Sequence, residues 1–208
     1  QAINVNDDNT AYTSENGVLM NKNKTRINVY PSGKKESVYN VSSGVTKIDE
    51  YAFYNCNNLQ AINVNDDNTA YTSENGVLMN KNKTSIKVYP SGKKESTFTI
   101  GKNISYVDAS LFKYCSNLQA FNVEEGNANY SAEDGVLFNK DKTRIKRYPV
   151  GKTDAYIINS SITDIGHNAF EGCNNVHITV AAGSRLNASS FLNSGLSDSQ
   201  IADITFEN

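Results

Sequence analysis

The stretch QAINVNDDNTAYTSENGVLMNKNKTRINVYPSGKKES (residues 1–37) decides the fold of this chain, because it occurs again at residues 60–96 with only two changes. A third, more diverged copy starts at Gln119. A repeat of fixed period indicates an array, in which no copy can bury its apolar face alone and each stacks on the next. The expected array spans residues 1–208, with units at 1–59, 60–118 and 119–176 and a C-terminal strand and capping segment at 177–208.

The second half of each copy combines two hydrophobic periods. From Val45 to Leu59 apolar residues recur every three or four positions, which is typical of a helical turn facing a core. From Ile62 the spacing becomes two, which predicts a short strand. Asp49 is a plausible N-cap for the helical turn. The apolar positions are Val45, Ile48, Ala52, Phe53, Cys56, Leu59, Ile62 and Val64 in copy one, with equivalents in Ile104–Val123 and Ile162–Val180.

The first half of each copy predicts an inserted β-hairpin. Asn16-Gly17 is a strong turn signal, since both residues tolerate positive φ, and it precedes the strand-like Val18-Leu19-Met20. A second strand follows at Ile27–Tyr30. Copy three carries Arg147 where the other copies have valine, so we expect one side of this strand to lie away from the core.

Another strand should precede the apolar half, with Tyr39 and Val41 pointing inward. Copy three is one residue short in the polar stretch Lys152–Ala155, which leaves the strand alternation intact. The tail has no counterpart upstream, as is common where a stack covers its last apolar face. It predicts a short helix at Arg185–Leu192 and a closing strand at Ile201–Phe206.

The pattern Val-x-x-Ile-x-x-x-Ala-Phe-x-x-Cys-x-x-Leu-x-x-Ile-x-Val at Val45–Val64, with its two equivalents, resembles the BspA-like (Treponema-type) leucine-rich repeat. The resemblance covers nearly the whole chain except the tail. It implies an α/β repeat solenoid: a leucine-rich-repeat-like right-handed superhelix of mostly short β-strands, with short helical turns and inserted β-hairpins. It also implies a secreted or surface-displayed bacterial protein, since some members of that family are adhesins toward host matrix proteins.

Composition argues against two classes of partner. With 20 basic and 22 acidic residues and a net charge of −2, the chain has no electrostatic footprint for nucleic acid. No run approaches the roughly 18 apolar residues of a transmembrane helix, so we expect no membrane insertion within this segment. No signal peptide is present, and Gln1 lies inside a unit, which suggests part of a longer protein.

Three cysteines, Cys56, Cys115 and Cys173, occupy equivalent positions and would align as a ladder. A tetrahedral metal site usually shows paired spacings such as Cys-x-x-Cys, which are absent here. Free cysteine behaves as a small buried hydrophobe, so we expect a structural role and no metal. The loop Asn65-Asp66-Asp67-Asn68 offers oxygen ligands for Ca²⁺, but copy three reads Glu-Glu-Gly-Asn, and a solvated turn is the preferred interpretation.

Nothing in the chain predicts catalysis. Only two histidines occur, His167 and His177, and the positions equivalent to His167 are Glu50 and Ala109, so the array repeats no general base. We therefore expect no enzyme activity and no cofactor.

A candidate interaction surface is formed by residues that should point outward. The two differences between the first copies, Arg26/Ser85 and Asn28/Lys87, fall on the inserted strand, where copies could diversify. Tyrosines that recur before proline either belong to this surface or pack the hairpin against the coil, the latter being favoured. The candidate residues are Asn4, Asn63, Asn122, Asn28, Lys87, Lys146, Tyr30, Tyr89 and Tyr148.

The expected function is a non-catalytic, extracellular or cell-surface protein-binding or adhesion module, with host or neighbouring-cell surface or matrix proteins as partners. The alternatives are a structural spacer (stalk) of a larger surface protein and a carbohydrate-binding module that takes glycans. The sequence also leaves open whether the inserted strand joins the main sheet.

Overall fold

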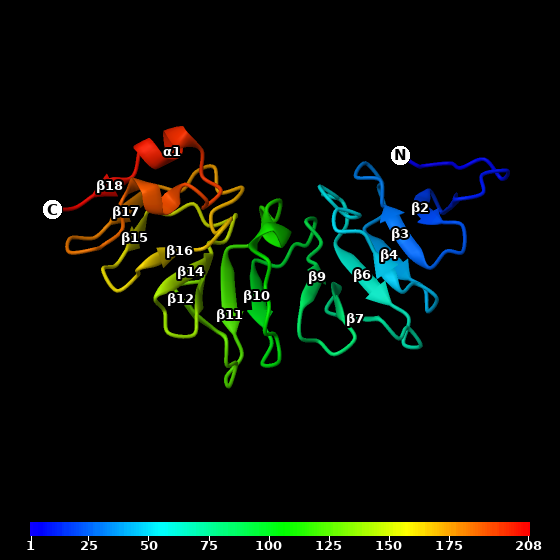
Figure 1. Ribbon diagram of the computed structural model, residues 1–208, viewed down its shortest axis with the longest axis horizontal. Helices are drawn as coiled ribbons and strands as arrows, with labels where there is room; N and C mark the ends of the chain where they lie inside the picture. The colour runs from blue at the N-terminus through cyan, green and yellow to red at the C-terminus, as the bar shows by residue number, and fades with distance from the viewer. The chain divides into compact units, whose positions relative to one another are not determined.

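The computed structural model describes all residues, 1–208. Its contacts divide the chain into two compact units, Gln1–Lys93 and Lys94–Asn208, which are described separately. Both are built as leucine-rich-repeat-like β-solenoid, with very little helix (Figure 1). The division falls inside the second sequence copy, so the predicted unit boundaries describe sequence periodicity and stay predictions as domain boundaries. The handedness of the expected superhelix also stays a prediction.

Short strands dominate both units. The strands of unit 1 are β1 (Tyr12–Glu15), β2 (Val18–Asn21), β3 (Arg26–Val29), β4 (Val38–Val41), β5 (Lys47–Ile48), β6 (Ala61–Val64), β7 (Tyr71–Glu74), β8 (Val77–Asn80) and β9 (Ile86–Val88). Unit 2 contains β10 (Thr97–Ile100), the 3₁₀ helix η1 (Ala109–Phe112), β11 (Ala120–Val123), β12 (Tyr130–Glu133), β13 (Val136–Asn139), β14 (Arg144–Arg147), β15 (Tyr156–Ile158), β16 (Asp164–Ile165), β17 (Ile178–Val180), the 3₁₀ helix η2 (Ala188–Phe191), α1 (Asp198–Ala202) and β18 (Thr205–Phe206).

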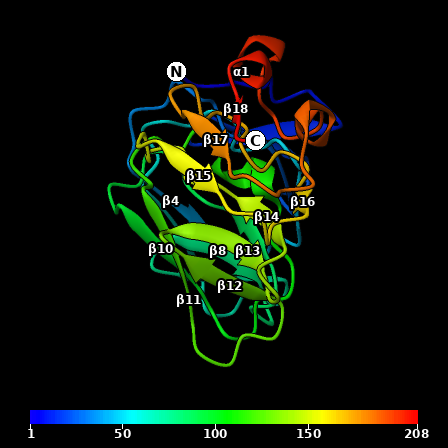
Figure 2. The same ribbon diagram turned by 90° about the vertical axis from the view of Figure 1, so that its left-hand side faces the viewer.

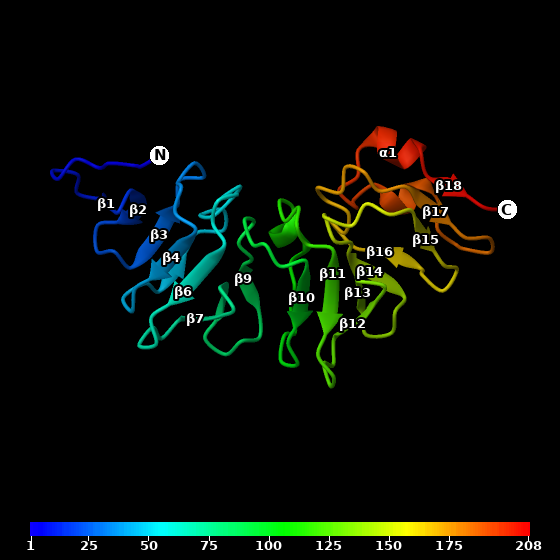
Figure 3. The same ribbon diagram turned by 180° about the vertical axis from the view of Figure 1, so that it is seen from behind.

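Parallel strand pairs carry the regular part of each copy. In unit 1, β4 pairs with β6 so that Tyr39 lies opposite Ile62 and Val41 opposite Val64. In unit 2, β10 pairs with β11 in the same register, and β15, β17 and β18 form a three-stranded parallel sheet. Seen from behind, β4 and β6 lie side by side, as do β10 and β11 (Figure 3). The predicted inward alternation is confirmed, since Val41 and Ile62 are buried.

The inserted segment forms a sheet of its own. The Asn16-Gly17 turn, with φ of 49° and 77°, joins β1 to β2 in an antiparallel hairpin. Strand β2 then pairs with β3, and β3 pairs in parallel with the short β5. In copy three the order β12-β13-β14-β16 repeats this arrangement. The inserted strand therefore belongs to this second sheet and not to the parallel sheet of β4 and β6.

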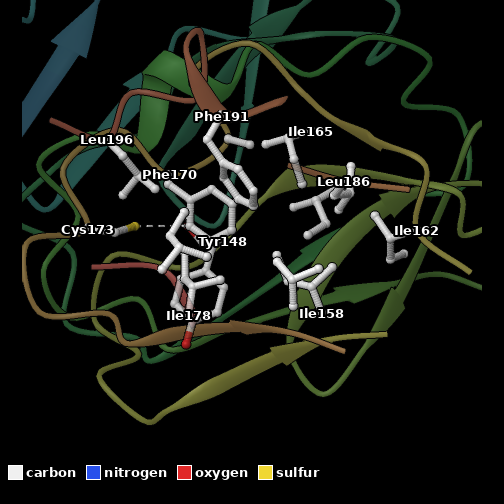
Figure 4. Close-up of a cluster of buried hydrophobic side chains, with 14 of the residues drawn as sticks. Tyr148, Ile158, Ile162, Ile165, Phe170, Cys173, Ile178, Leu186, Phe191 and Leu196 are labelled. Atoms are coloured by element: carbon white, nitrogen blue, oxygen red, sulfur yellow. Dashed lines mark hydrogen bonds between the residues drawn. The ribbon is translucent and has the colours of Figure 1, made fainter. Parts of the chain in front are cut away.

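Each unit has its own hydrophobic core, and the cores use the same aromatic arrangement. Tyr30 stacks on Phe53 at a centroid distance of 5.4 Å, and Tyr148 stacks on Phe170 at 5.4 Å. Such a pair contributes about 0.5–1.5 kcal/mol beyond its buried area. In unit 2 the stack continues to Phe191, and Figure 4 shows these rings together with Ile158 and Ile178.

The helical turns expected in each copy are formed mostly as successive turns or a short 3₁₀ helix. In copy one, the backbone from Asp49 onward forms successive turns without a helix, and the Asp49 carboxylate binds Arg26 and Asn28 instead of capping. Copy two does form the short η1, whose N-cap Asp108 accepts a bond from the Ser110 N–H at 3.0 Å. The predicted cap is thus correct only where its carboxylate has no competing partner on the inserted strand.

Two expectations about copy three and the tail are wrong in part. Arg147 is fully buried, not turned away from the core. The tail helix is only the η2 segment, and Ile201 lies in α1, which leaves Thr205–Phe206 as the closing strand (Figure 2). Ser197 caps α1 and Gln200 completes the capping box, a Ser-x-x-Gln signal that predicts a helix start at this position.

Candidate functional site

The exposed side of the parallel strands is the clearest candidate surface. Asn63 and Asn122, both predicted to point outward, are exposed on β6 and β11, and Asn4 is exposed on the N-terminal segment. Because side chains alternate along a strand, the buried neighbours of each asparagine direct it to solvent. Each unit has its own outer parallel-strand face: Asn40 and Asn63 form that of unit 1, and Thr99, Asn122 and Ile157 belong to that of unit 2.

This face is polar and uncharged. The Asn63 amide donates to the Asn40 side chain at 3.3 Å, so the two amides form the start of a ladder across β4 and β6. Thr99 lies opposite Asn122 on β10 and β11. Ile157, which lies opposite Thr179 on β15 and β17, is an apolar residue that is 63% exposed. Exposed amides and hydroxyls can satisfy donors and acceptors of many partners, as an adaptable protein-binding surface does.

The other predicted residues, Asn28, Lys87 and Lys146, lie on the inserted strands β3, β9 and β14, each in a different sheet, and are not part of an outer parallel-strand face. Asn28 is half-buried and donates to Asp49 Oδ2 at 2.9 Å, while Arg26 Nε donates to Asp49 Oδ1 at 2.6 Å. Lys87 is exposed, with Ser85 where copy one has Arg26. In copy three burial and then the nearby Arg144 lower the pKa of Lys146. The structure therefore places the predicted residues on two kinds of strand, the parallel strands and the inserted strands.

The three tyrosines before proline must be removed from the candidate surface. Tyr30, Tyr89 and Tyr148 are only 2%, 4% and 0% exposed. Burial raises the pKa of Tyr30 to about 12. The rings of Tyr30 and Tyr148 pack against Phe53 and Phe170, as the competing interpretation predicted. The reason is that the Tyr-Pro turn closes the inserted strand directly over the core.

The three equivalent cysteines are buried structural residues. Cys56, Cys115 and Cys173 are buried and free. Cys56 and Cys173 point their thiols at the carbonyl oxygens of Tyr30 and Tyr148, each at 3.7 Å. Burial raises the pKa of Cys56 and Cys173 to about 11 and that of Cys115 to about 12. A nucleophilic cysteine needs the opposite environment, one that lowers the thiol pKa.

Two asparagines form structural sites that the sequence interpretation missed. Asn68 and Asn127 are fully buried at the end of the loops considered for Ca²⁺. The Asn68 amide donates to the carbonyls of Ser42 and Val45, both at 2.8 Å, and its oxygen accepts the N–H groups of Ala70 and Tyr71. Asn127 repeats this set of four bonds. The signal was available, because this asparagine is the one residue of the tetrapeptide that all three copies share.

No group of three or more His, Cys, Asp or Glu side chains gathers as a metal ion would require. His167 and His177 are both exposed. Separately, no helix has the length and apolar character to cross a membrane.

The profile of the BspA type leucine rich repeat region matches residues 30–146 and 148–208, in 6 copies. The chain belongs to this family. The matched range includes the tail. No relative is found among curated proteins.

Solved structures of bacterial leucine-rich repeat proteins resemble this member of the BspA-type family. A leucine-rich repeat protein from Eubacterium ventriosum is 23% identical, with a TM-score of 0.46 over 77% of this chain and 41% of that chain. The pneumococcal vaccine antigen PcpA is 18% identical, with a TM-score of 0.48 over 82% and 39%. A leucine rich cell surface protein from Faecalibacterium prausnitzii is 20% identical, with a TM-score of 0.52 over 88% and 55%.

The last of these structures supports the fold, and at 20% identity it supports the fold alone. The chain spans between 39% and 55% of the length of the three structures. The functions of those whole proteins can therefore be carried over to this chain only as proposals.

Proposed function

We propose that the chain is a non-catalytic interaction module of a secreted or cell-surface bacterial protein, and that it binds a protein partner over the outer parallel-strand face of one or both units. The observation that carries this proposal is the set of exposed amides and hydroxyls on β4 and β6 in unit 1 and on β10 and β11 in unit 2, which no core packing requires. One structural neighbour is itself described as a cell surface protein, which agrees with the proposed location. Solenoids in general present such extended surfaces to partners.

The non-catalytic part of the proposal is supported by the state of the strongest potential nucleophiles. All three thiols are buried, and burial raises their pKa. At neutral pH they remain protonated and out of contact with solvent, and a protonated thiol is a poor nucleophile.

The test is binding of the purified chain to a panel of host matrix proteins and mucin glycans at physiological salt, measured by surface plasmon resonance. A variant with Asn40, Asn63, Thr99 and Asn122 all changed to alanine should lose binding while keeping its melting temperature. The matched control is Asn23→Ala with Asn82→Ala, which removes exposed amides from the tips of the β2–β3 and β8–β9 hairpins. Equal binding by both variants would remove the outer parallel-strand face as the site.

The spacer function is a second candidate, favoured by the near-identity of residues 1–37 and 60–96. A duplicated copy lengthens a stalk without adding a new site. The spacer function would be favoured if a folded, monodisperse sample bound no member of the panel.

A carbohydrate-binding role would have to use other rings than those first considered. Tyr51 and Tyr106 are 68% and 62% exposed, whereas the tyrosines before proline are buried. A glycan signal in the panel that is lost in a Tyr51→Ala or Tyr106→Ala variant would favour this role.

A further inference from the structure

Copies one and two each bury an equivalent lysine against the backbone carbonyl of the Asn-Gly turn. We call this site the lysine cradle. Lys34 and Lys93 follow the Pro-Ser-Gly turn and are only 7% and 6% exposed. Lys34 Nζ donates to the Asn16 carbonyl, and Lys93 Nζ donates to the Asn75 carbonyl, each at 2.7 Å. These carbonyls belong to the Asn-Gly turns that join β1 to β2 and β7 to β8. The fold thus contains a site, built twice, that receives a primary ammonium group on an aliphatic stem.

A carboxylate completes the cradle in copy one. Glu36 Oε1 lies 3.0 Å from Lys34 Nζ, and the ammonium lies 5.7 Å from the centre of the Tyr30 ring. A buried ammonium is costly unless it is paired and hydrogen-bonded, and the turn carbonyl together with this carboxylate meets that requirement.

In copy three the equivalent lysine is placed differently. Lys152 Nζ lies 3.6 Å from Asp154 Oδ2, and no hydrogen bond joins it to the carbonyl of Asp134, the counterpart of Asn16. Its side chain is 22% exposed, against 8% for Lys34. This is the polar stretch in which copy three is one residue short.

A pocket of about 330 Å³ lies where the lysine of the other copies is buried. Its floor is closely packed, because a Cβ at Gly151 would meet the carbonyl oxygen of Ser116, and one at Gly135 would meet the Cβ of Ala120 at 2.9 Å. Two carboxylate residues line it, Asp134 and Asp154, against one cation. The lining residues are Gln119, Ala120, Asp134, Gly135, Gly151, Lys152, Thr153 and Asp154.

The charge of this lining selects the class of ligand. Asp134 replaces the neutral Asn16 and Asn75, so copy three adds a negative charge at the turn whose carbonyl holds an ammonium elsewhere. Lys152 is engaged by Asp154, which leaves Asp134 as the charge that a ligand would meet. An anionic ligand is disfavoured there, whereas a cation gains a charge-assisted hydrogen bond.

We propose that this pocket binds the ammonium group of a lysine side chain presented by a partner protein. The proposal deepens the proposed function, on which it rests, by stating one chemical feature of the partner. A lysine stem and head fit because the same fold encloses them in copies one and two. Amino sugars share the ammonium group, and the experiment separates them from lysine.

The experiment is a titration of the full chain, followed by NMR chemical shifts of the backbone N–H groups. The probes are Nα-acetyl-lysine methylamide, its norleucine analogue, which lacks the ammonium group, and glucosamine. The proposal expects saturable shifts at Gly135, Gly151 and Thr153 with the lysine probe and none with norleucine. Shifts of equal size with norleucine, no shifts at all, or tighter binding of glucosamine than of lysine would overturn it.

Variants test the named groups without risk to the fold. Asp134→Asn places the residue of copies one and two at this turn and should weaken lysine binding by about tenfold, the value of one charge-assisted bond. Lys93→Ala frees the cradle of copy two and should add shifts at Gly76 and Gly92. Unchanged affinity in Asp134→Asn would contradict the proposal.

Lys152→Ala tests whether the pocket is filled from within. The proposal expects unchanged or tighter binding, since Lys152 pairs with Asp154. Binding that appears only in this variant would mean that Lys152 itself occupies the cradle in the native chain, and would overturn the proposal. These probes require no macromolecular partner, so the two experiments can fail independently. A failed titration would not change the result of the binding panel, and the absence of binding in the panel would not change the result of the titration.

Discussion

The last residue of the strand before the Tyr-Pro turn has opposite environments in copies one and three. Val29 ends β3 and is 41% exposed, whereas Arg147 ends β14 and is 0% exposed. Arg147 donates from its two terminal nitrogens to the carbonyls of Asn168 and Glu171, at 2.8 and 2.7 Å. A valine is thus on the surface and an arginine is in the core at the same position of the repeat.

The neighbouring coil explains this inversion. Arg147 lies near Cys115 of the preceding copy as well as Cys173 of its own, and its burial lowers the pKa of its guanidinium. Val88 is the equivalent residue of copy two, and it packs against the core that is built mainly from copy one. The position is therefore buried by the copy before it, and the residue type decides only how its polar groups are satisfied. Burial in an array is a property of the interface between copies.

The largest expected effect comes from exchanging the residues of this comparison. Arg147→Val should lower the free energy of unfolding by about 2–5 kcal/mol, because it leaves a cavity and two buried carbonyls without donors. Val29→Arg should change it by less than about 0.5 kcal/mol, as exposed substitutions do. Both are measured by urea denaturation followed by circular dichroism.

Arg147→Met sharpens this result, because it restores volume without donors. If Arg147→Met loses nearly as much unfolding free energy as Arg147→Val, the effect comes from the lost hydrogen bonds. If Arg147→Met loses little, the effect comes from packing. The account fails if Arg147→Val and Val29→Arg are equally mild.

The second prediction compares Asn68 with Asn9. Asn68→Ala should cost about 3 kcal/mol, since two carbonyls and two N–H groups lose their partner in the core. Asn9 accepts only the N–H groups of Ala11 and Tyr12 and is exposed, so Asn9→Ala should cost about 1 kcal/mol. Thermal unfolding of the two variants provides the measurement, and equal losses would show that the coil contacts contribute nothing.

The third prediction concerns alkaline pH. The folded state raises the pKa of Cys56 and Cys173 from 9.0 to about 11, so it holds these protons more tightly than the unfolded chain does. The stabilisation is complete below pH 9.0 and is lost as the pH rises from there through about 11. The urea midpoint should fall across this window.

A variant with all three cysteines changed to alanine is the control for that titration. It starts from a lower stability, but its midpoint should fall less steeply between pH 9.0 and 10, below the range in which the buried tyrosines titrate. An identical slope in both proteins would show that the thiols are not the groups responsible.

The smallest effect compares the two kinds of lysine. Lys93→Ala should cost about 1 kcal/mol, because the hydrogen bond from the buried Lys93 to the Asn75 carbonyl is lost. Lys152→Ala should stay within about 0.5 kcal/mol, since its pair with the exposed Asp154 contributes little. Differential scanning calorimetry resolves the two, and a larger loss for Lys152 would show that its head is buried.

Much of the architecture could be predicted from local sequence. The spacing of Tyr39, Val41 and Ile62 predicted the parallel strands, and Asn16-Gly17 predicted the hairpin, because both signals act within a few residues. The equivalence of the three cysteines predicted their burial. In each case the residue type and its immediate neighbours decide the outcome.

The errors concern contacts between segments that lie more than twenty residues apart in sequence. Asp49 bonds Arg26 from the inserted strand and so forms no helix cap, and Arg147 is covered by a coil more than twenty residues away in sequence. The fully satisfied Asn68 also depends on carbonyls of the preceding coil. The expected outward direction is confirmed for Asn63 and Asn122, whereas the three tyrosines are buried, since alternation predicts direction on a strand but not at a turn.

The central claim is that each copy is completed by the copy before it, so that only positions left uncovered can meet a partner. The most direct measurement is hydrogen exchange of side-chain amides by NMR in the unmodified chain. The account predicts that the amide protons of Asn68 and Asn127 are retained long after those of Asn9 and Asn63 have exchanged. Equally fast exchange at all four asparagines would contradict it.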